Sequence, residues 1–137
     1  MKKIVCLLLC FVIIAIPVLS MANVAVEYNG TKIEFPDVQP EVKDGVPILP
    51  LRAVFETMGA GVYWEENDKM IMAQRNSNFI IMQIGSPNLF IGSEPVALDN
   101  APYIMADRTM VGTDVIEKAF NVKVEWNAEQ NIVSITE

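Results

Sequence analysis

The sequence predicts an α+β fold in which antiparallel strands and hairpins wrap around two short helices, with a pseudo-twofold internal duplication. Three observations lead to this prediction. Apolar and polar residues alternate along several short segments, and turn residues separate those segments. Two stretches of about eight residues carry apolar side chains at helical spacing. The same order of segments occurs twice, because the sequence matches itself at an offset of 62 residues.

Residues 1–22 have the three parts of a secretory signal peptide. Two lysines give a positive start, an unbroken apolar run covers residues 4–16, and Ser20-Met21-Ala22 supplies small residues at the −3 and −1 positions. We predict cleavage after Ala22, with cleavage after Ser20 as the weaker option. A retained membrane anchor is the alternative, but the apolar run is shorter than the roughly 20 residues that span a bilayer.

Removal of this segment changes the chemistry of the chain. Both cysteines, Cys6 and Cys10, lie in the apolar run, so the mature chain forms no disulfide and no thiolate metal site. Two of the 10 basic residues are also lost, which leaves eight against 17 acidic residues and a net charge of −9. The whole chain lacks histidine, which excludes histidine-based catalysis and histidine metal sites.

A single domain is expected over residues 23–137, with repeats at approximately 24–74 and 88–136. The offset aligns Gly30 with Gly92 and Trp64 with Trp126. Two units of this size would each bury little surface alone, so one domain with a shared core is the simpler expectation.

The first repeat begins with an alternating strand that ends at Asn29-Gly30, a strong signal for a hairpin turn. Asp44-Gly45 then interrupts a short apolar strand that ends at Pro50. A helix is predicted next, with Gly59 as its C-terminal stop, because four apolar residues fall on one face. These residues are Leu51, Val54, Phe55 and Met58.

The second repeat has different residues at the start and end of its helix. Its helix is predicted to have Thr113 or Asp114 as the N-cap and Asn121 as a left-handed exit. An extra strand over 79–84 joins the repeats, and its run of Phe-Ile-Ile-Met suggests burial on both faces.

The segment from Pro50 to Ala60, followed by Val62-Tyr63-Trp64, resembles the copper amine oxidase N-terminal-like domain, or stalk domain, of exported bacterial envelope proteins. The resemblance extends over nearly all of residues 24–136 as two tandem copies. The second copy departs from the pattern, since it has Gly112-Thr113-Asp114 where the family usually has Pro-Leu-Arg.

This resemblance implies an α+β domain of antiparallel strands around short helices, without an activity of its own. In the enzymes that gave the family its name, copper and a quinone cofactor lie in a separate catalytic domain that uses histidine ligands. Neither a copper site nor oxidase activity is therefore expected here, and no cofactor is predicted.

The aromatic residues and one arginine are the candidates for special roles. Trp64 and Trp126 are expected to be core residues, because each follows a valine at the same place in its repeat. Tyr63 faces the other way along its strand, and it and Tyr103 are the exposed aromatics that a ligand-binding module would use. Arg52 is expected to form an ion pair that fixes the second hairpin of its repeat against the helix.

The remaining polar and sulfur-containing candidates have structural explanations. Glu65, Glu66, Asn67 and Asp68 form an acidic turn whose spacing lacks that of a calcium loop, so we predict a solvated turn. The methionines are expected to fill the core rather than hold a cofactor. They are Met58, Met70, Met72 and Met82. No catalytic, cofactor-binding or metal-ligating residue is predicted.

The sequence therefore predicts a non-enzymatic, exported cell-envelope module that serves as an interaction or spacer (stalk) domain. The alternatives are a module that binds wall glycan or peptide, and a minimal carboxylate-based hydrolase, although nothing selects two of the 17 acids as a catalytic pair. The expected partner is an envelope protein or a wall component. The acidic mature chain has no basic patch, so neither nucleic acid nor, after cleavage, an anionic membrane is an expected partner.

Overall fold

The computed structural model describes residues 23–137, and the predicted signal peptide lies outside these residues. Two helices, α1 (Leu51–Thr57) and α2 (Thr113–Phe120), are accompanied by thirteen strands. The strands are β1 (Ala25–Tyr28), β2 (Thr31–Lys32), β3 (Glu41–Lys43), β4 (Val46–Pro50), β5 (Gly61–Glu65), β6 (Met70–Arg75), β7 (Asn78–Gln83), β8 (Asn88–Ile91), β9 (Glu94–Ala97), β10 (Tyr103–Met105), β11 (Arg108–Gly112), β12 (Lys123–Asn127) and β13 (Ile132–Thr136).

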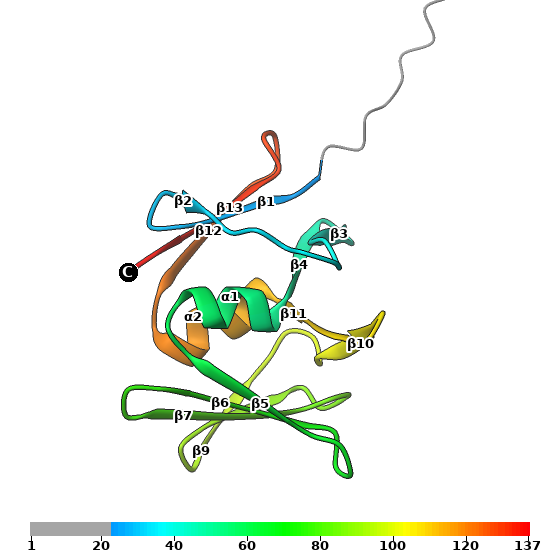
Figure 1. Cartoon of the computed structure of the whole chain (residues 1–137), viewed down its shortest axis with the longest axis vertical. Helices are drawn as coiled ribbons and strands as arrows, with labels where there is room; N and C mark the ends of the chain where they lie inside the picture. Colours follow the sequence, from blue (N-terminus) through cyan, green and yellow to red (C-terminus); the bar gives the residue numbers. More distant parts are fainter. Residues whose placement is uncertain (1–22) are drawn as a thin grey trace, which may run out of the picture.

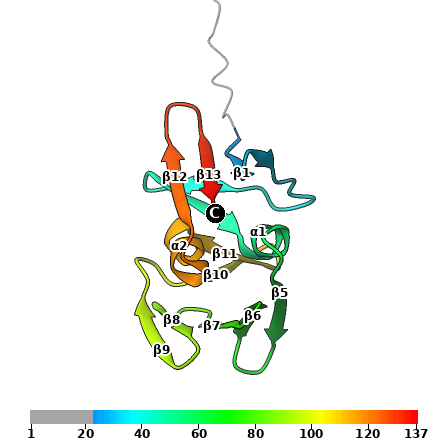
Figure 2. The same cartoon turned by 90° about the vertical axis from the view of Figure 1, so that its left-hand side faces the viewer.

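The strands form three sheets. Sheet A has the order β12-β13-β1-β2, sheet B the order β10-β11-β4-β3, and sheet C the order β5-β6-β7-β8-β9. Sheets A and C lie at opposite ends of the molecule, and sheet B lies with the two helices between them (Figures 1 and 2). The predicted α+β fold class, with antiparallel strands around two short helices, is confirmed.

Tight turns with left-handed backbone shape the hairpins. The predicted Asn29-Gly30 turn has φ values of 47° and 82°, as a two-residue hairpin turn requires. Asp44 and Gly45 form an equivalent turn with φ values of 52° and 76°. The prediction of one interrupted strand there is wrong, because the chain reverses at this turn and β3 pairs with β4.

The ends of the helices follow the predicted stops but not the predicted caps. Gly59 follows α1 with φ of 85°, and Asn121 ends α2 with φ of 53°. The N-cap of α2 is Gly112, not Thr113 or Asp114, and it makes no side-chain capping bond. The Asp114 carboxylate instead accepts a hydrogen bond of 2.8 Å from the backbone N–H of Asp99, which ties the helix to the preceding connection.

One hydrophobic core joins the sheets and helices. Its members extend from Val24 to Ile135, so both repeats contribute to the same cluster of buried side chains. The rings of Phe55 and Phe120, one from each helix, meet edge to face with their centroids 4.8 Å apart. No polar or charged residue is buried in this described part of the chain. The fold is therefore stabilised mainly by apolar burial.

The methionine prediction holds for two of the four residues. Met58 and Met82 are buried, but Met70 and Met72 are half-exposed on the outer face of sheet C. The inward positions of β6 belong to Ile71 and Ala73. The alternation is therefore one residue out of phase with the prediction, and Met70 and Met72 do not fill the core.

The linking strand β7 is buried on one face only. Ile80 and Met82 point into the core, whereas Phe79 on the other face is 40% exposed. The prediction of burial on both faces is wrong, because β7 is the central strand of a sheet whose outer face has no covering layer among residues 23–137.

The first and last strands meet in sheet A. β1 pairs in parallel with β13, with Val26 opposite Val133. Arg75 at the end of β6 holds Glu137 through two hydrogen bonds of 2.9 and 2.6 Å. This contact and the Tyr28 hydroxyl lower the pKa of Glu137.

Over the part of the chain that the structure describes, neither helix has the length and apolar character needed to cross a membrane.

Candidate functional site

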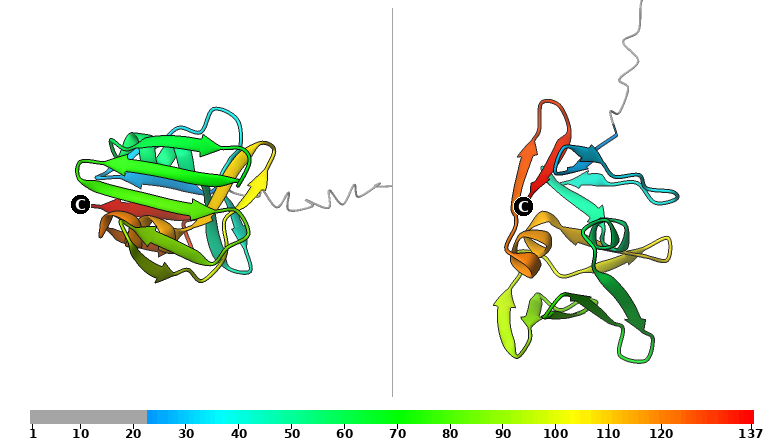
Figure 3. Two further views of the ribbon diagram at one scale, coloured as in Figure 1. Left: turned by 90° about the horizontal axis from the view of Figure 1, so that it is seen from below. Right: turned by 60° about the vertical axis from the view of Figure 1, so that its left-hand side comes forward.

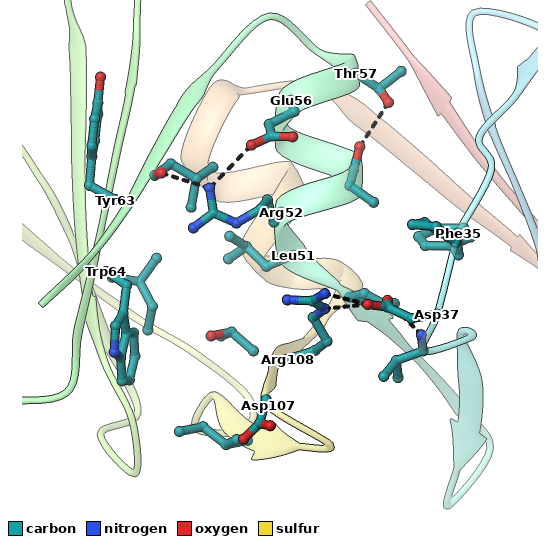
Figure 4. A pocket seen from close by; sticks show the side chains of 18 of the residues that line it. Phe35, Asp37, Leu51, Arg52, Glu56, Thr57, Tyr63, Trp64, Asp107 and Arg108 are labelled. Carbon is teal, nitrogen blue, oxygen red and sulfur yellow. Dashed lines mark hydrogen bonds and ion pairs between the residues drawn. The ribbon is translucent and has the colours of Figure 1, made fainter. Parts of the chain in front are cut away.

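A groove of about 880 Å³ runs beside α1 (Figure 4). Four segments form its walls: the exposed side of the helix, the edge strand β5, the connection from β2 to β3, and the hairpin of β10 and β11. Because these segments come from distant parts of the sequence, only the folded chain brings the groove together. Its principal lining residues are Asp37, Leu51, Arg52, Trp64, Asp107 and Arg108.

Arg52 links the helix to the edge of sheet C. Its Nη1 donates to Glu56 Oε1 at 3.2 Å and to the backbone carbonyl of Val62 at 2.9 Å. The ion pair lies within α1 and does not reach the hairpin, so the prediction is wrong in its partner; the bond that reaches the hairpin of β5 and β6 goes to the Val62 carbonyl oxygen. A guanidinium has several donors in a fixed fork, so it can satisfy both acceptors at once.

A second arginine closes the opposite wall. The guanidinium of Arg108 donates two hydrogen bonds to Asp37 Oδ2 from 71 residues away in the sequence. This contact, with the backbone N–H of Val38, lowers the pKa of Asp37, and Asp37 raises the pKa of Arg108. Both groups are therefore charged at neutral pH. Sequence reasoning missed this pair, because nothing local connects the two residues.

Trp64 lies at the end of the groove and is only half-buried, as is Trp126. The prediction that both are core residues is therefore wrong in degree, although both pack against the core. The reason is that β5 and β12 are edge strands, so one side of each indole stays open. The Trp64 indole N–H donates to Glu66, which lowers the pKa of that carboxyl together with Lys69.

The two tyrosines differ in exposure. Tyr63 is 59% exposed, as predicted for a surface aromatic, and it is among the residues that line the groove (Figure 4). Tyr103 is not the exposed aromatic that was expected, because it is half-buried between sheet strands. Its hydroxyl donates to Glu41 Oε1 at 2.8 Å, and the Lys43 ammonium lies 4.9 Å from its ring centroid. The hydroxyl and one side of the Tyr103 ring therefore already have partners within the chain.

The acidic turn is held by its own backbone. Both oxygens of Glu65 accept from the backbone N–H groups of Asn67 and Asp68, which lowers the pKa of Glu65. In residues 23–137 no group of three acidic side chains is placed to hold a metal ion. The turn therefore has a structural explanation.

The comparison with known families agrees with this architecture. The family model described as the copper amine oxidase N-terminal domain matches residues 27–135. The chain belongs to that family. Comparison with curated proteins gives no match. The N-terminal domain of copper amine oxidases is non-catalytic, so membership gives a stalk-like module and assigns no reaction to the groove.

Substitution of Arg52 tests whether its hydrogen bond to the Val62 carbonyl stabilises the fold. We expect Arg52→Met to lower the free energy of unfolding by about 0.5 to 1.5 kcal/mol, because the Val62 carbonyl loses its donor. Glu56→Gln is the control and should cost less than about 0.5 kcal/mol, since it weakens only an exposed ion pair. Urea unfolding measures both. Equal losses would show that the bond to Val62 contributes nothing.

The Tyr103 hydroxyl is expected to lose its proton at a higher pH than an ordinary tyrosine. Burial, followed by its hydrogen bond to Glu41, raises the pKa of Tyr103 to about 12. The native state therefore keeps this proton over a range in which the unfolded state, with a pKa of 10.0, loses it. Stability from this group should be complete below pH 10 and fall as pH rises to about 12. Ultraviolet titration should show a tyrosinate step near pH 12 that is absent in Tyr103→Phe. Persistence of the step in that variant would contradict the assignment.

Proposed function

We propose that this chain is a non-enzymatic, exported cell-envelope module that acts by interaction or as a spacer. The observation that carries the proposal is its membership of a family whose domain is non-catalytic. An enzyme would need reactive side chains that are available to a substrate and not already bound in structural contacts. Both arginines of the groove do the opposite, since Arg52 binds Glu56 and the backbone and Arg108 binds Asp37.

The state of the carboxyl groups supports this proposal. Hydrolysis of a glycan by two carboxylates needs one of them to carry a proton, which requires a raised pKa. Among the described acids whose pKa departs from its usual value, the shift is downward in every case. These acids are Asp37, Glu65, Glu66 and Glu137. Each is therefore held as an ionised structural partner.

Hydrolysis of wall material tests the non-enzymatic proposal. Residues 23–137 should release no reducing ends from purified peptidoglycan or a glycan panel, and Asp37→Asn and Asp107→Asn should behave like the parent. Both carboxyls line the groove, so they are the first candidates for a hidden reaction. Turnover that a single one of these changes abolishes would overturn the proposal.

Internal duplication is part of the proposal. Contacts between positions 62 apart support it, because in a two-fold arrangement a residue close to the axis meets its own equivalent. Such pairs include Leu49 with Val111, Glu41 with Tyr103, and Arg75 with Glu137. The ion pair of Arg52 and Glu56 also recurs 62 positions later, with its charges exchanged, as Asp114 and Lys118.

Export of the module rests on residues 1–22, and it has a simple test. Expression of the full chain in a secreting bacterium should yield protein whose first residue is Asn23, measured by intact mass. Retention of the full mass in the membrane fraction would make the segment an anchor instead. Full-length protein that stays in the cytoplasm would contradict export.

A wall-glycan or peptide-binding module is the second candidate function, and the half-exposed Trp64 in the groove favours it. Retention on purified walls, with and without calcium, tests it. The variant Trp64→Phe should reduce retention. The variant Trp126→Phe should not, because Trp126 lies outside the groove on β12, an edge strand of sheet A. No retention of the parent in either condition, or equal effects of the two variants, would contradict a binding groove.

A further inference from the structure

The outer face of sheet C carries an unbroken line of apolar side chains, which we name the apolar row. The strand register places one such residue on each of the five strands, directly opposite the next. The row consists of Tyr63, Met72, Ile81, Phe90 and Pro95. Phe79 lies two residues before Ile81 on β7 and widens the row. Figure 3 (left) looks onto this sheet from outside.

These side chains are exposed, except that Met72 and Ile81 are half-buried. Tyr63 is 59% exposed, and Phe79 and Phe90 are each 40% exposed. Gly61 lies beneath the Tyr63 ring, because a Cβ atom placed on Gly61 would be only 3.2 Å from the Tyr63 hydroxyl. The ring therefore lies along its own strand and covers Gly61.

The same face is almost free of charge, although the mature chain is strongly acidic. Its polar flanking positions include the amides Gln74, Gln83 and Asn88. The charged member of the face is Glu65, whose carboxylate is bound to the backbone of its own turn. Two copies of an acidic chain repel each other, so a neutral face is where they can approach.

Sheet A provides an internal comparison. The corresponding outward row there runs across β12, β13, β1 and β2 and is entirely polar. Its members, in register, are Glu125, Ser134, Glu27 and Lys32. Glu125 and Ser134 lie 62 positions after Tyr63 and Met72. The fold therefore accepts polar residues at these positions, and the apolar character of sheet C needs another explanation.

We propose that the outer face of sheet C packs on the same face of a second copy of this chain. Aromatic residues and methionine are enriched, and charged residues are depleted, at protein interfaces. Amide side chains both donate and accept hydrogen bonds, so the margin of the face is complementary to itself. A two-fold axis through the face would pair each row with its equivalent.

The size of the face sets the expected strength. Five strands spaced about 4.8 Å apart, with three rows of outward side chains, give roughly 500 Å² in each copy. The total of roughly 1,000 Å² is at the lower limit for a specific interface, which predicts a weak, reversible dimer. The first and last strands, β1 and β13, both belong to sheet A, at the other end of the molecule from sheet C (Figure 1).

Sedimentation of residues 23–137 from about 1 µM to about 1 mM tests the proposal. The parent should shift from monomer to dimer, and Tyr63→Lys and Phe90→Lys should each weaken association at least about tenfold, which corresponds to about 1.4 kcal/mol. The matched control is Ser134→Lys, which adds the same charge to the equivalent row of sheet A and should leave the association constant within about twofold.

Thermal melts at low concentration check that each variant is folded. A parent that stays monomeric throughout the range would overturn the proposal. It would also be overturned by a dimer that neither Tyr63→Lys nor Phe90→Lys weakens. A monomer that binds a neutral glycan, and loses that binding in Phe90→Lys, would assign the row to a ligand instead.

Discussion

Replacement of Phe55 by alanine is expected to lower the free energy of unfolding by about 3 to 5 kcal/mol. The side chain is 0% exposed, and its ring meets that of Phe120 edge to face. It joins the two helices, which lie between sheets A and C, so the neighbouring elements cannot easily close the cavity. Urea unfolding followed by circular dichroism measures the loss.

Phe79→Ala is the matched control, because it removes the same side chain from a position that is 40% exposed. It should cost less than about 1 kcal/mol when measured at low protein concentration, since little surface returns to water. Equal losses for the two variants would mean that the helix-to-helix contact does not define the core.

Val26→Asp is expected to unfold the chain, with a loss of more than about 4 kcal/mol. Val26 is 0% exposed in β1, between β13 and β2, and no polar residue among 23–137 is buried near it to accept a charge. A carboxylate there loses its water without gaining a partner. Circular dichroism and a thermal melt report the result.

The control for this experiment is Thr31→Asp, at an exposed position of the neighbouring strand β2. It should change stability by less than about 0.5 kcal/mol, as surface substitutions usually do. A folded Val26→Asp variant with a melting temperature near that of the parent would show that β1 contributes nothing to the core.

The local pattern was enough to predict the fold class and most of its elements. Helical spacing from Leu51 to Met58 and the glycine at 59 place α1 within one residue of where it occurs. Asn29-Gly30 predicts its turn because few other pairs accept two positive φ angles. These features depend only on neighbouring residues, which a single sequence contains.

Several wrong predictions concern the surroundings of a strand, which depend on residues distant in the sequence. Alternation predicts which way Trp64 and Trp126 face, but it does not tell that β5 and β12 are edge strands. The partners of Tyr103 are Glu41 and Lys43, which lie on β3, about 60 residues earlier in the sequence and on the other edge strand of sheet B. The groove was not predicted for the same reason, because its walls come from segments far apart in the sequence.

The parallel pairing of β1 and β13 has a mechanical consequence. The chain enters β1 at one side of sheet A and leaves β13 at the other (Figure 1). Tension applied between these two points pulls the strands past each other along their length. All hydrogen bonds of the pair then carry the force together, as a shear load, rather than opening one after another. A module joined to its surroundings through both ends would resist extension at the seam where its first and last strands meet.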